Sequence, residues 1–270
     1  MLTILATDIL RNNYQHRGVR RKMEAIIYIS HGSRSKDWNE QFISFITETM
    51  KENIAPIQAY GFFELATPSI GEAIESCIQR GATTVTVVPV LLLSGNHALI
   101  DIPTEIAESQ AQFPTIPIMY ANVLGSDRLF LPAIKEKLQE KGYQQTQNKL
   151  VLLVAHGSGH VETAQELSQL TKVVREELEK PVEWGYLSRD PHYLKKLEIT
   201  LLKEYQKIYI VPHFLSKGGF TDKIERQLHE AFPSEFGNQI ILCNPTGYHE
   251  LLHTMIQNRA RTPKKPTIKQ

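Results

Sequence analysis

The sequence predicts an α/β protein of two similar lobes, each a parallel four-stranded sheet flanked by helices, related by internal duplication. Two observations predict this fold. Apolar runs of strand length alternate with amphipathic helical stretches along the chain, which is typical of parallel sheets covered by helices on both faces. In addition, three segments of the first half recur in the same order in the second half, which indicates a duplicated unit.

The repeated segments keep a nearly constant spacing. The matching pairs are AIIYISHGSRS (25–35) with LVLLVAHGSGH (150–160), AYGFFELATPS (59–69) with EWGYLSRDPHY (183–193), and VTVVPVLLLSGN (85–96) with IYIVPHFLSKGG (208–219). His31 and His156 of the first pair lie 125 residues apart, and Pro89 and Pro212 of the third lie 123 apart. Matches in order at one offset indicate that a whole lobe was duplicated.

Each half follows the same order of elements. In the first half we expect strands at 25–30, 56–62, 84–92 and 116–121 and helices at 37–52, 68–80, 101–111 and 127–141. In the second half we expect strands at 150–155, 182–187, 207–213 and 239–243 and helices at 161–179, 191–204, 221–231 and 247–257. The polar stretch EKGYQQTQNK at 140–149 joins the halves.

These elements define the expected organisation of the chain. An N-terminal lobe at 23–143 carries the active site, and a degenerate repeat forms the C-terminal lobe at 144–258. Residues 1–22 put apolar before basic residues, the reverse of a secretory signal. Because the first core-like strand begins right after Met23, we expect a native start there and an upstream extension without fold. The basic, proline-containing stretch 259–270 is expected to be a disordered tail.

Composition excludes several classes of function. With 30 Lys and Arg against 29 Asp and Glu, the formal charge of +1 gives no global field for nucleic acid or an anionic membrane. No apolar run has the length of a membrane helix. The two cysteines, Cys77 and Cys243, form no C-x-x-C pair, which argues against disulfide, iron–sulfur and zinc sites and fits a cytoplasmic protein. Phosphate-loop, dinucleotide and G-x-S-x-G motifs are absent from the sequence, so we expect chemistry without a nucleotide.

Three candidate functional residues follow successive strands of the first half. Ligands of open parallel sheets bind beyond the carboxyl ends of the strands, which is where His31, Glu64 and His97 fall. Each also has a structural alternative: a strand-to-helix turn at His31 with Gly32 supplying backbone freedom, a plain loop histidine, and a solvated carboxylate. Asp101 we expect to be a helix N-cap.

The second half acts as an internal control for these residues. It has Phe220 at the repeat position of His97 and Ser188 near that of Glu64, so only the histidine at 156 is retained. The combined loss indicates one working site, in the N-terminal half. Two imidazoles and a carboxylate suit Fe²⁺, Co²⁺ or Ni²⁺ and also accept protons near neutral pH, which is what insertion of a metal into a tetrapyrrole demands.

Four segments carry a resemblance to a known family. The strand followed by HGSR, the FFELATPSI segment, VVPVLLLSGNHALIDIP and the second copy VLLVAHGSG resemble the sirohydrochlorin chelatase family, the class II tetrapyrrole chelatases, in its long two-lobed bacterial form. The most specific element is G-x-H-x-x-x-D-I-P, from Gly95 to Pro103. The match spans about residues 24–245.

The resemblance implies a monomeric lyase that inserts Fe²⁺ into sirohydrochlorin without ATP, releasing two protons and giving siroheme. It implies that His31 and His97 bind the metal and accept protons, with Glu64 as carboxylate partner and no permanently bound cofactor. Insertion of Co²⁺ for cobalamin is the alternative, with iron favoured by the lack of a His-rich tract. A carrier of tetrapyrrole or metal that does not catalyse insertion is the alternative of another class.

The substrate implied is a polycarboxylate, so cations are needed near the cleft. Candidates at predicted strand ends or loops are Arg34, Arg128, Arg189 and Lys217. For each, the alternative is a solvated surface charge. Donors to the substrate are also expected from Ser94, Gly95 and Asn96, although Gly95 also suits a turn of the chain. The roles of His156, His160 and His213 in the second half stay open.

Overall fold

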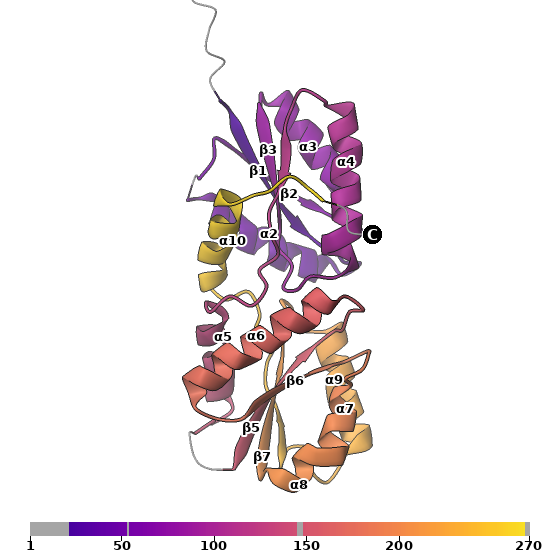
Figure 1. Cartoon of the computed structure of the whole chain (residues 1–270), viewed down its shortest axis with the longest axis vertical. Coiled ribbons are helices and arrows are strands. Elements are labelled where there is room, and N and C mark those ends of the chain that lie inside the picture. The colour runs from indigo at the N-terminus through magenta and orange to yellow at the C-terminus, as the bar shows by residue number, and fades with distance from the viewer. Residues whose placement is uncertain (1–21, 53, 145–147, 268–270) are drawn as a thin grey trace, which may run out of the picture.

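Two four-stranded parallel sheets lie end to end in an elongated molecule (Figure 1). The computed structural model describes residues 22–52, 54–144 and 148–267. The expected N-terminal extension therefore lies almost wholly outside the described residues. Within them, no helix is long and apolar enough to cross a membrane.

The first sheet has the strand order β2-β1-β3-β4. Its strands are β1 (Glu24–Ser30), β2 (Ile57–Phe62), β3 (Thr84–Pro89) and β4 (Ile118–Tyr120). The helices that follow them are α2 (Lys36–Met50), α3 (Ile70–Gln79) and α4 (Ile102–Gln112), the last continuous with a π-helical turn at His97–Asp101. Helices cover both faces, so the central strands are largely apolar, and five consecutive residues of β1 are buried.

The second sheet repeats this order as β6-β5-β7-β8, which confirms the internal duplication. Its strands are β5 (Lys149–Ala155), β6 (Val182–Tyr186), β7 (Lys207–Pro212) and β8 (Ile240–Leu242). The main helices are α6 (Val161–Leu178) and α9 (Gly219–Ala231). The helix expected at 191–204 is divided into α7 (Tyr193–Lys196), a π-helical turn at Leu197–Leu201 and α8 (Leu202–Glu204).

The two lobes exchange a helix. Helix α5 (Phe130–Glu140) follows the first sheet along the chain but packs against β7 of the second, where Phe130 contacts the ring of His213 edge-on at 4.9 Å. Helix α10 (Leu251–Arg261) ends the second half but packs against β3 and α2 of the first lobe (Figure 1). One hydrophobic core joins both sheets through these helices, including Val88, Phe130 and Met255. The boundary expected at 143/144 therefore separates the two sequence repeats, but it does not separate two independently packed lobes.

The expectation of a disordered tail at 259–270 is wrong for residues 259–267. The Arg259 guanidinium donates to the carbonyl oxygens of Val123 and Leu124 at 2.8 and 2.7 Å. Lys264 then pairs with Tyr120 of the edge strand β4 through two backbone hydrogen bonds, of 2.8 and 2.9 Å. Basic residues and prolines suggested disorder, but an open sheet edge offers backbone partners that composition does not reveal.

Candidate active site

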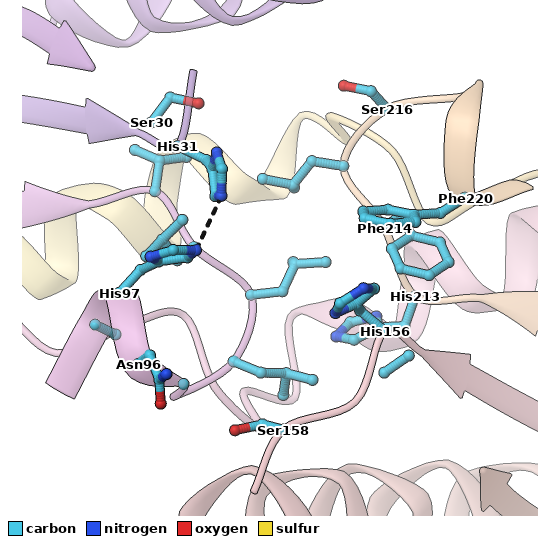
Figure 2. A pocket seen from close by; sticks show the side chains of 18 of the residues that line it. Ser30, His31, Asn96, His97, His156, Ser158, His213, Phe214, Ser216 and Phe220 are labelled. Atoms are coloured by element: carbon cyan, nitrogen blue, oxygen red, sulfur yellow. Dashed lines mark hydrogen bonds between the residues drawn. The ribbon is translucent and has the colours of Figure 1, made fainter. Parts of the chain in front are cut away.

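A cavity of about 670 Å³ lies between the lobes, at the carboxyl ends of both sheets (Figure 2). Residues that follow β1 and β3 form one wall, and residues that follow β5 and β7 form the other. Both halves of the chain thus build a single site, in the place where parallel sheets bind ligands.

His31 is held by the turn that follows β1. Its Nδ1 atom lies 3.1 Å from the carbonyl oxygen of Gly32. Gly32 has a φ of +89°, and a Cβ atom there would lie 1.7 Å from the carbonyl oxygen of Glu64. The His-Gly-Ser motif therefore needs its glycine both for the left-handed backbone and for the close approach of the neighbouring strand end.

His97 opens the π-helical turn that precedes α4, and its Nδ1 atom lies 2.8 Å from Oδ2 of Asp101. The expectation that Asp101 caps a helix is wrong, because this residue lies inside a continuous helix and makes no capping hydrogen bond. The wider π turn brings residues 97 and 101 onto one face, where the carboxylate orients the imidazole. Such turns often mark functional sites.

The two histidines face each other through Nε2 atoms 3.0 Å apart. A carbonyl oxygen and a carboxylate only accept hydrogen bonds, so their contacts assign the proton of each neutral ring to Nδ1. Both Nε2 atoms then carry lone pairs directed at the same point. One shared proton or one metal cation satisfies this arrangement, and metal–nitrogen bonds of about 2.1 Å would let both atoms bind one ion as cis ligands.

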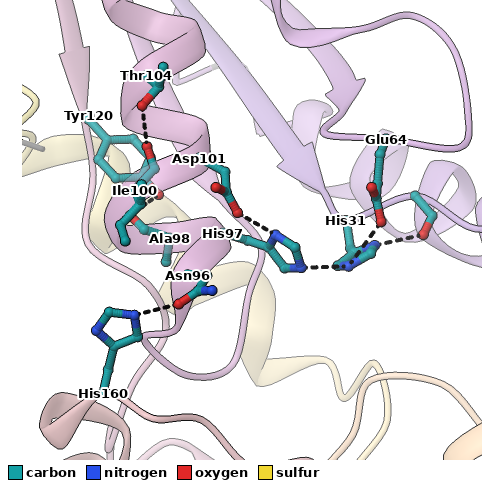
Figure 3. A network of polar contacts seen from close by, with 11 residues as sticks. His31, Glu64, Asn96, His97, Ala98, Ile100, Asp101, Thr104, Tyr120 and His160 are labelled. Atoms are coloured by element: carbon teal, nitrogen blue, oxygen red, sulfur yellow. Dashed lines mark hydrogen bonds and ion pairs between the residues drawn. The ribbon is translucent and has the colours of Figure 1, made fainter. Parts of the chain in front are cut away.

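Glu64 approaches the pair from the side. Its Oε1 atom lies 3.6 Å from Nε2 of His31, so the polar chain runs from Asp101 through both histidines to Glu64 (Figure 3). Glu64 does not itself line the cavity. Across the described residues, no group of three or more His, Cys, Asp or Glu side chains is assembled to hold a metal. The structure therefore brings together a two-histidine site with a carboxylate at its edge.

The second lobe keeps the framework of this site and loses its ligands. Ser188 donates its N–H to the carbonyl of His156 at 3.1 Å, as Glu64 does to His31 at 2.9 Å. The rings of His156 and Phe220 lie 4.5 Å apart, the same centroid distance as in the pair of His31 and His97. The correspondence expected from the repeats is thus confirmed.

The loop from Ser94 to Asn96 is tied to the second lobe. Ser94 is 8% exposed and donates its N–H and its hydroxyl to the Glu166 carboxylate of α6, at 2.7 and 2.6 Å. Asn96 contacts Nε2 of His160 through its side-chain oxygen at 2.6 Å. The two Ser94 donors, expected to meet the substrate, are occupied in holding the lobes together. Gly95 lines the cavity with a φ outside the left-handed range.

Of the four cations expected near the substrate, the structure brings only Arg189 to the cavity. Arg34 is exposed, Arg128 lies 4.0 Å from Glu177, and Lys217 lines a different hollow. Arg189 follows β6 at the position that Leu65 occupies after β2. The positive charge of the described cavity wall thus comes from the second lobe, opposite the histidine pair.

Sequence reasoning missed several residues of the cavity wall, including Trp38, Asn39, Ser158, His213, Phe214 and Tyr248. Trp38 of α2 lies against Gly218 of the other lobe, where a Cβ atom would come within 2.5 Å of its ring. His213 is buried, which lowers its pKa to about 4, and its Nε2 atom has no hydrogen-bond partner among the residues that the structure describes. The repeat held a clue, because His213 aligns with an apolar residue, Val90.

Fold and site together define a two-lobed α/β protein with a histidine pair at the mouth of an interlobe cavity. A family model described as CbiX matches the chain twice, over residues 25–141 and 150–262. The chain belongs to the CbiX family, and the resemblance seen in its motifs is confirmed.

Relatives with assigned activities match most of the chain. The sirohydrochlorin ferrochelatase of Priestia megaterium is 31% identical over 242 residues, which cover 89% of this chain and 90% of that protein. The sirohydrochlorin cobaltochelatase of the same organism is 25% identical over 253 residues, covering 92% and 82%. The solved structure of SirB from Bacillus subtilis with Fe³⁺ matches with a TM-score of 0.78 at 28% identity, over 88% of this chain and 94% of that one.

Proposed function

We propose that this protein is a sirohydrochlorin ferrochelatase, which inserts Fe²⁺ into sirohydrochlorin without ATP and releases two protons. The observation that carries the proposal is the convergence of the His31 and His97 imidazoles, with their Nε2 atoms 3.0 Å apart. Two neutral imidazoles bind a borderline ion such as Fe²⁺, but fewer ligands than a structural site uses leave the ion free to transfer.

The contacts behind the pair supply its orientation. Asp101 fixes the tautomer of His97, and the Gly32 carbonyl does the same for His31. Such outer partners hold the ring nitrogens toward the ion and strengthen them as ligands. Glu64, 3.6 Å from His31, can join as a third ligand or receive a proton when the metal leaves the pair.

The substrate enters between the lobes in this proposal. The volume of about 670 Å³ lies in the range of small-molecule sites, and Arg189 gives a charge-assisted partner for one substrate carboxylate. Ser33, Asn39 and Ser158 add polar side chains to the wall. Because both walls belong to one chain, we propose that a monomer contains the complete site. Two buried free thiols, Cys77 and Cys243, accord with a reducing cytoplasm.

Cobalt is the second candidate metal. The same ligands accept Co²⁺. Of two relatives that match most of the chain, the one with 31% sequence identity is named a ferrochelatase and the one with 25% identity a cobaltochelatase. The relative of 31% identity is a ferrochelatase, which favours iron. Initial rates of the purified protein with each ion, under anaerobic conditions and at equal free metal, would decide. A kcat/KM higher for Co²⁺ than for Fe²⁺ would reverse the assignment.

A carrier that binds tetrapyrrole or metal without inserting it is the alternative of another class. Sirohydrochlorin in tenfold excess over protein, mixed anaerobically with Fe²⁺ and followed by absorbance, separates the two. A chelatase converts the whole substrate pool faster than the reaction without protein. A carrier changes the spectrum of at most one equivalent per chain and then stops.

A further inference from the structure

We propose that His156 of the second lobe is a further catalytic residue, a base that takes a pyrrole N–H proton from the substrate while the metal is delivered by His31 and His97. This inference rests on the proposed chelatase function and adds a residue from the lobe that lost its metal ligands. In this proposal the wall of the first lobe binds the metal ion, and the wall of the second lobe accepts a proton.

The position of His156 supports this role. The residue lines the cavity and is exposed to it, on the wall across from His31 and His97 (Figure 2). Its ring packs against Phe220 with the ring centroids 4.5 Å apart. A neutral imidazole carries a hydrogen on one ring nitrogen, and the other nitrogen keeps a lone pair for an incoming proton.

The neighbours of His156 make it unsuited to hold an ion as its twin does. Phe220 replaces the second imidazole, Ile224 replaces the orienting aspartate, and Ser188 replaces the carboxylate. A single imidazole against an aromatic ring cannot bind a metal as a pair, but it remains a proton acceptor. This pattern accounts for a histidine retained where its three partners were lost.

The surroundings favour the neutral ring that a base requires. Burial is the main cause that lowers the pKa of His156, and the positive charge of Lys223 on α9 acts in the same direction. His31 and His97 contribute weakly from the opposite wall. Other titratable or cationic side chains of the second half that line the cavity are Arg189 after β6, His213 after β7 and Tyr248 after β8. Among the described residues, the one carboxylate that lines the cavity is Asp101, which lies beside His97 on the opposite wall.

The proton balance of the step is simple. The lone pair of the free His156 nitrogen forms an N–H bond with the pyrrole proton, and the pyrrole nitrogen uses the electron pair released to bind Fe²⁺ as the ion leaves the histidine pair. The imidazolium then loses its proton to solvent in the open cavity. The second proton leaves through the metal-binding wall, and no oxidant or reductant is involved.

The test measures Fe²⁺ insertion by the whole protein, with sirohydrochlorin and Fe²⁺ varied separately, in wild type, His156→Phe and His156→Gln. His229→Gln, an exposed histidine on the outside of α9, is the matched control. We expect kcat to fall about 100-fold in both His156 variants, the usual size of a general-base contribution, while KM for Fe²⁺ changes less than about twofold. At saturating Fe²⁺, kcat of wild type should decline toward acid pH as the His156 ring becomes protonated, and both variants should lose this decline.

Other outcomes have distinct meanings. If wild type inserts iron and the His156 variants match it in kcat, this inference is wrong while the chelatase function stands. If the variants instead lose Fe²⁺ binding, or change only KM for sirohydrochlorin, then His156 is a ligand or a binding residue and the proton role is overturned. If wild type itself does not insert metal, the proposed function fails first. Two variants, each checked by thermal unfolding, separate a misfolded protein from a missing base.

Discussion

Glu166 and Ser94 join the two lobes at the root of the loop that carries His97. The Glu166 carboxylate accepts both the backbone N–H and the hydroxyl of Ser94, at 2.7 and 2.6 Å, three residues before His97. Thr163, one turn earlier on α6, donates to the Ser94 carbonyl. A helix of the second lobe therefore positions a metal-binding histidine of the first.

Replacing Glu166 by alanine should impair both stability and catalysis. Loss of two hydrogen bonds to a charged acceptor costs about 2 kcal/mol of unfolding free energy, because the Ser94 donors are left buried. The loop is then free to shift, so kcat should fall about tenfold or more. Urea unfolding and anaerobic insertion assays measure the two effects. Gln169→Ala, exposed on the same helix, is the control, and equal losses in both variants would contradict a specific link.

The charge on Glu166 gives a pH signature. Burial is the main cause that raises the pKa of this carboxyl in the folded protein. A raised pKa means that the folded state binds more protons, so this group's contribution to stability grows as pH falls from the raised value toward about 4.5. Glu166→Gln removes that contribution. The unfolding free energy of wild type, measured relative to that of Glu166→Gln, should increase as pH is lowered from 7 to 5. A difference that does not change with pH would contradict this contribution of Glu166.

Asp101 is predicted to act through His97 rather than on the substrate. Asp101→Ala frees the ring to rotate and to change tautomer, so kcat/KM for Fe²⁺ should drop about 10- to 100-fold. Asp101→Asn, which keeps an acceptor, should lose less. Glu108→Gln, exposed on α4, serves as control. Titration with Co²⁺ checks the cause, because weakened metal binding in Asp101→Ala is required.

His213 should make the protein sensitive to acid. Burial lowers its pKa to about 4 in the folded state, against about 6.5 when unfolded. The unfolded state therefore binds more protons between these values, and about 2 kcal/mol of stability is lost from pH 7 to pH 5. His213→Val, which introduces the residue of the repeat position 90, should reduce this loss. Denaturant midpoints at both pH values measure it, and an unchanged pH dependence would show that His213 is not responsible.

Arg259 should stabilise the first lobe from the end of the chain. It donates to the carbonyls of Val123 and Leu124 and lies 3.3 Å from a carboxylate oxygen of Asp127. Arg259→Ala should cost about 2 kcal/mol. Arg261→Ala, exposed on the same helix, should cost little. Comparable thermal shifts for the two variants would argue against the role of α10 in holding the first lobe.

The sequence predicted the sheets and the histidine pair because both follow from the order of strands and helices along the chain. Strand and helix periods alternate twice, and parallel strands place their carboxyl ends together, which brings His31 and His97 within reach. The repeat also marked Phe220 as the degenerate partner, since its ring lies where His97 does in the other lobe.

The remaining features depend on packing that a local pattern does not encode. Periodicity gives α5 and α10 an apolar face without saying which sheet it covers, so the helix exchange was missed. The role of Asp101 depends on the helix beginning at His97 and not near Pro103, because only then do residues 97 and 101 lie on one helix face. Placement of Arg189 in the cavity, and of Arg34 and Lys217 outside it, follows from how the lobes meet.

The central claim is that His31 and His97 together deliver the metal, and His97→Phe tests it most directly. This variant gives the first lobe the histidine–phenylalanine pair already present at His156 and Phe220, so the ring packing is preserved. Anaerobic siroheme formation should fall by about 1,000-fold or more in kcat/KM for Fe²⁺, since one imidazole alone holds the ion poorly. Siroheme formation by this variant at the wild-type rate would contradict the account.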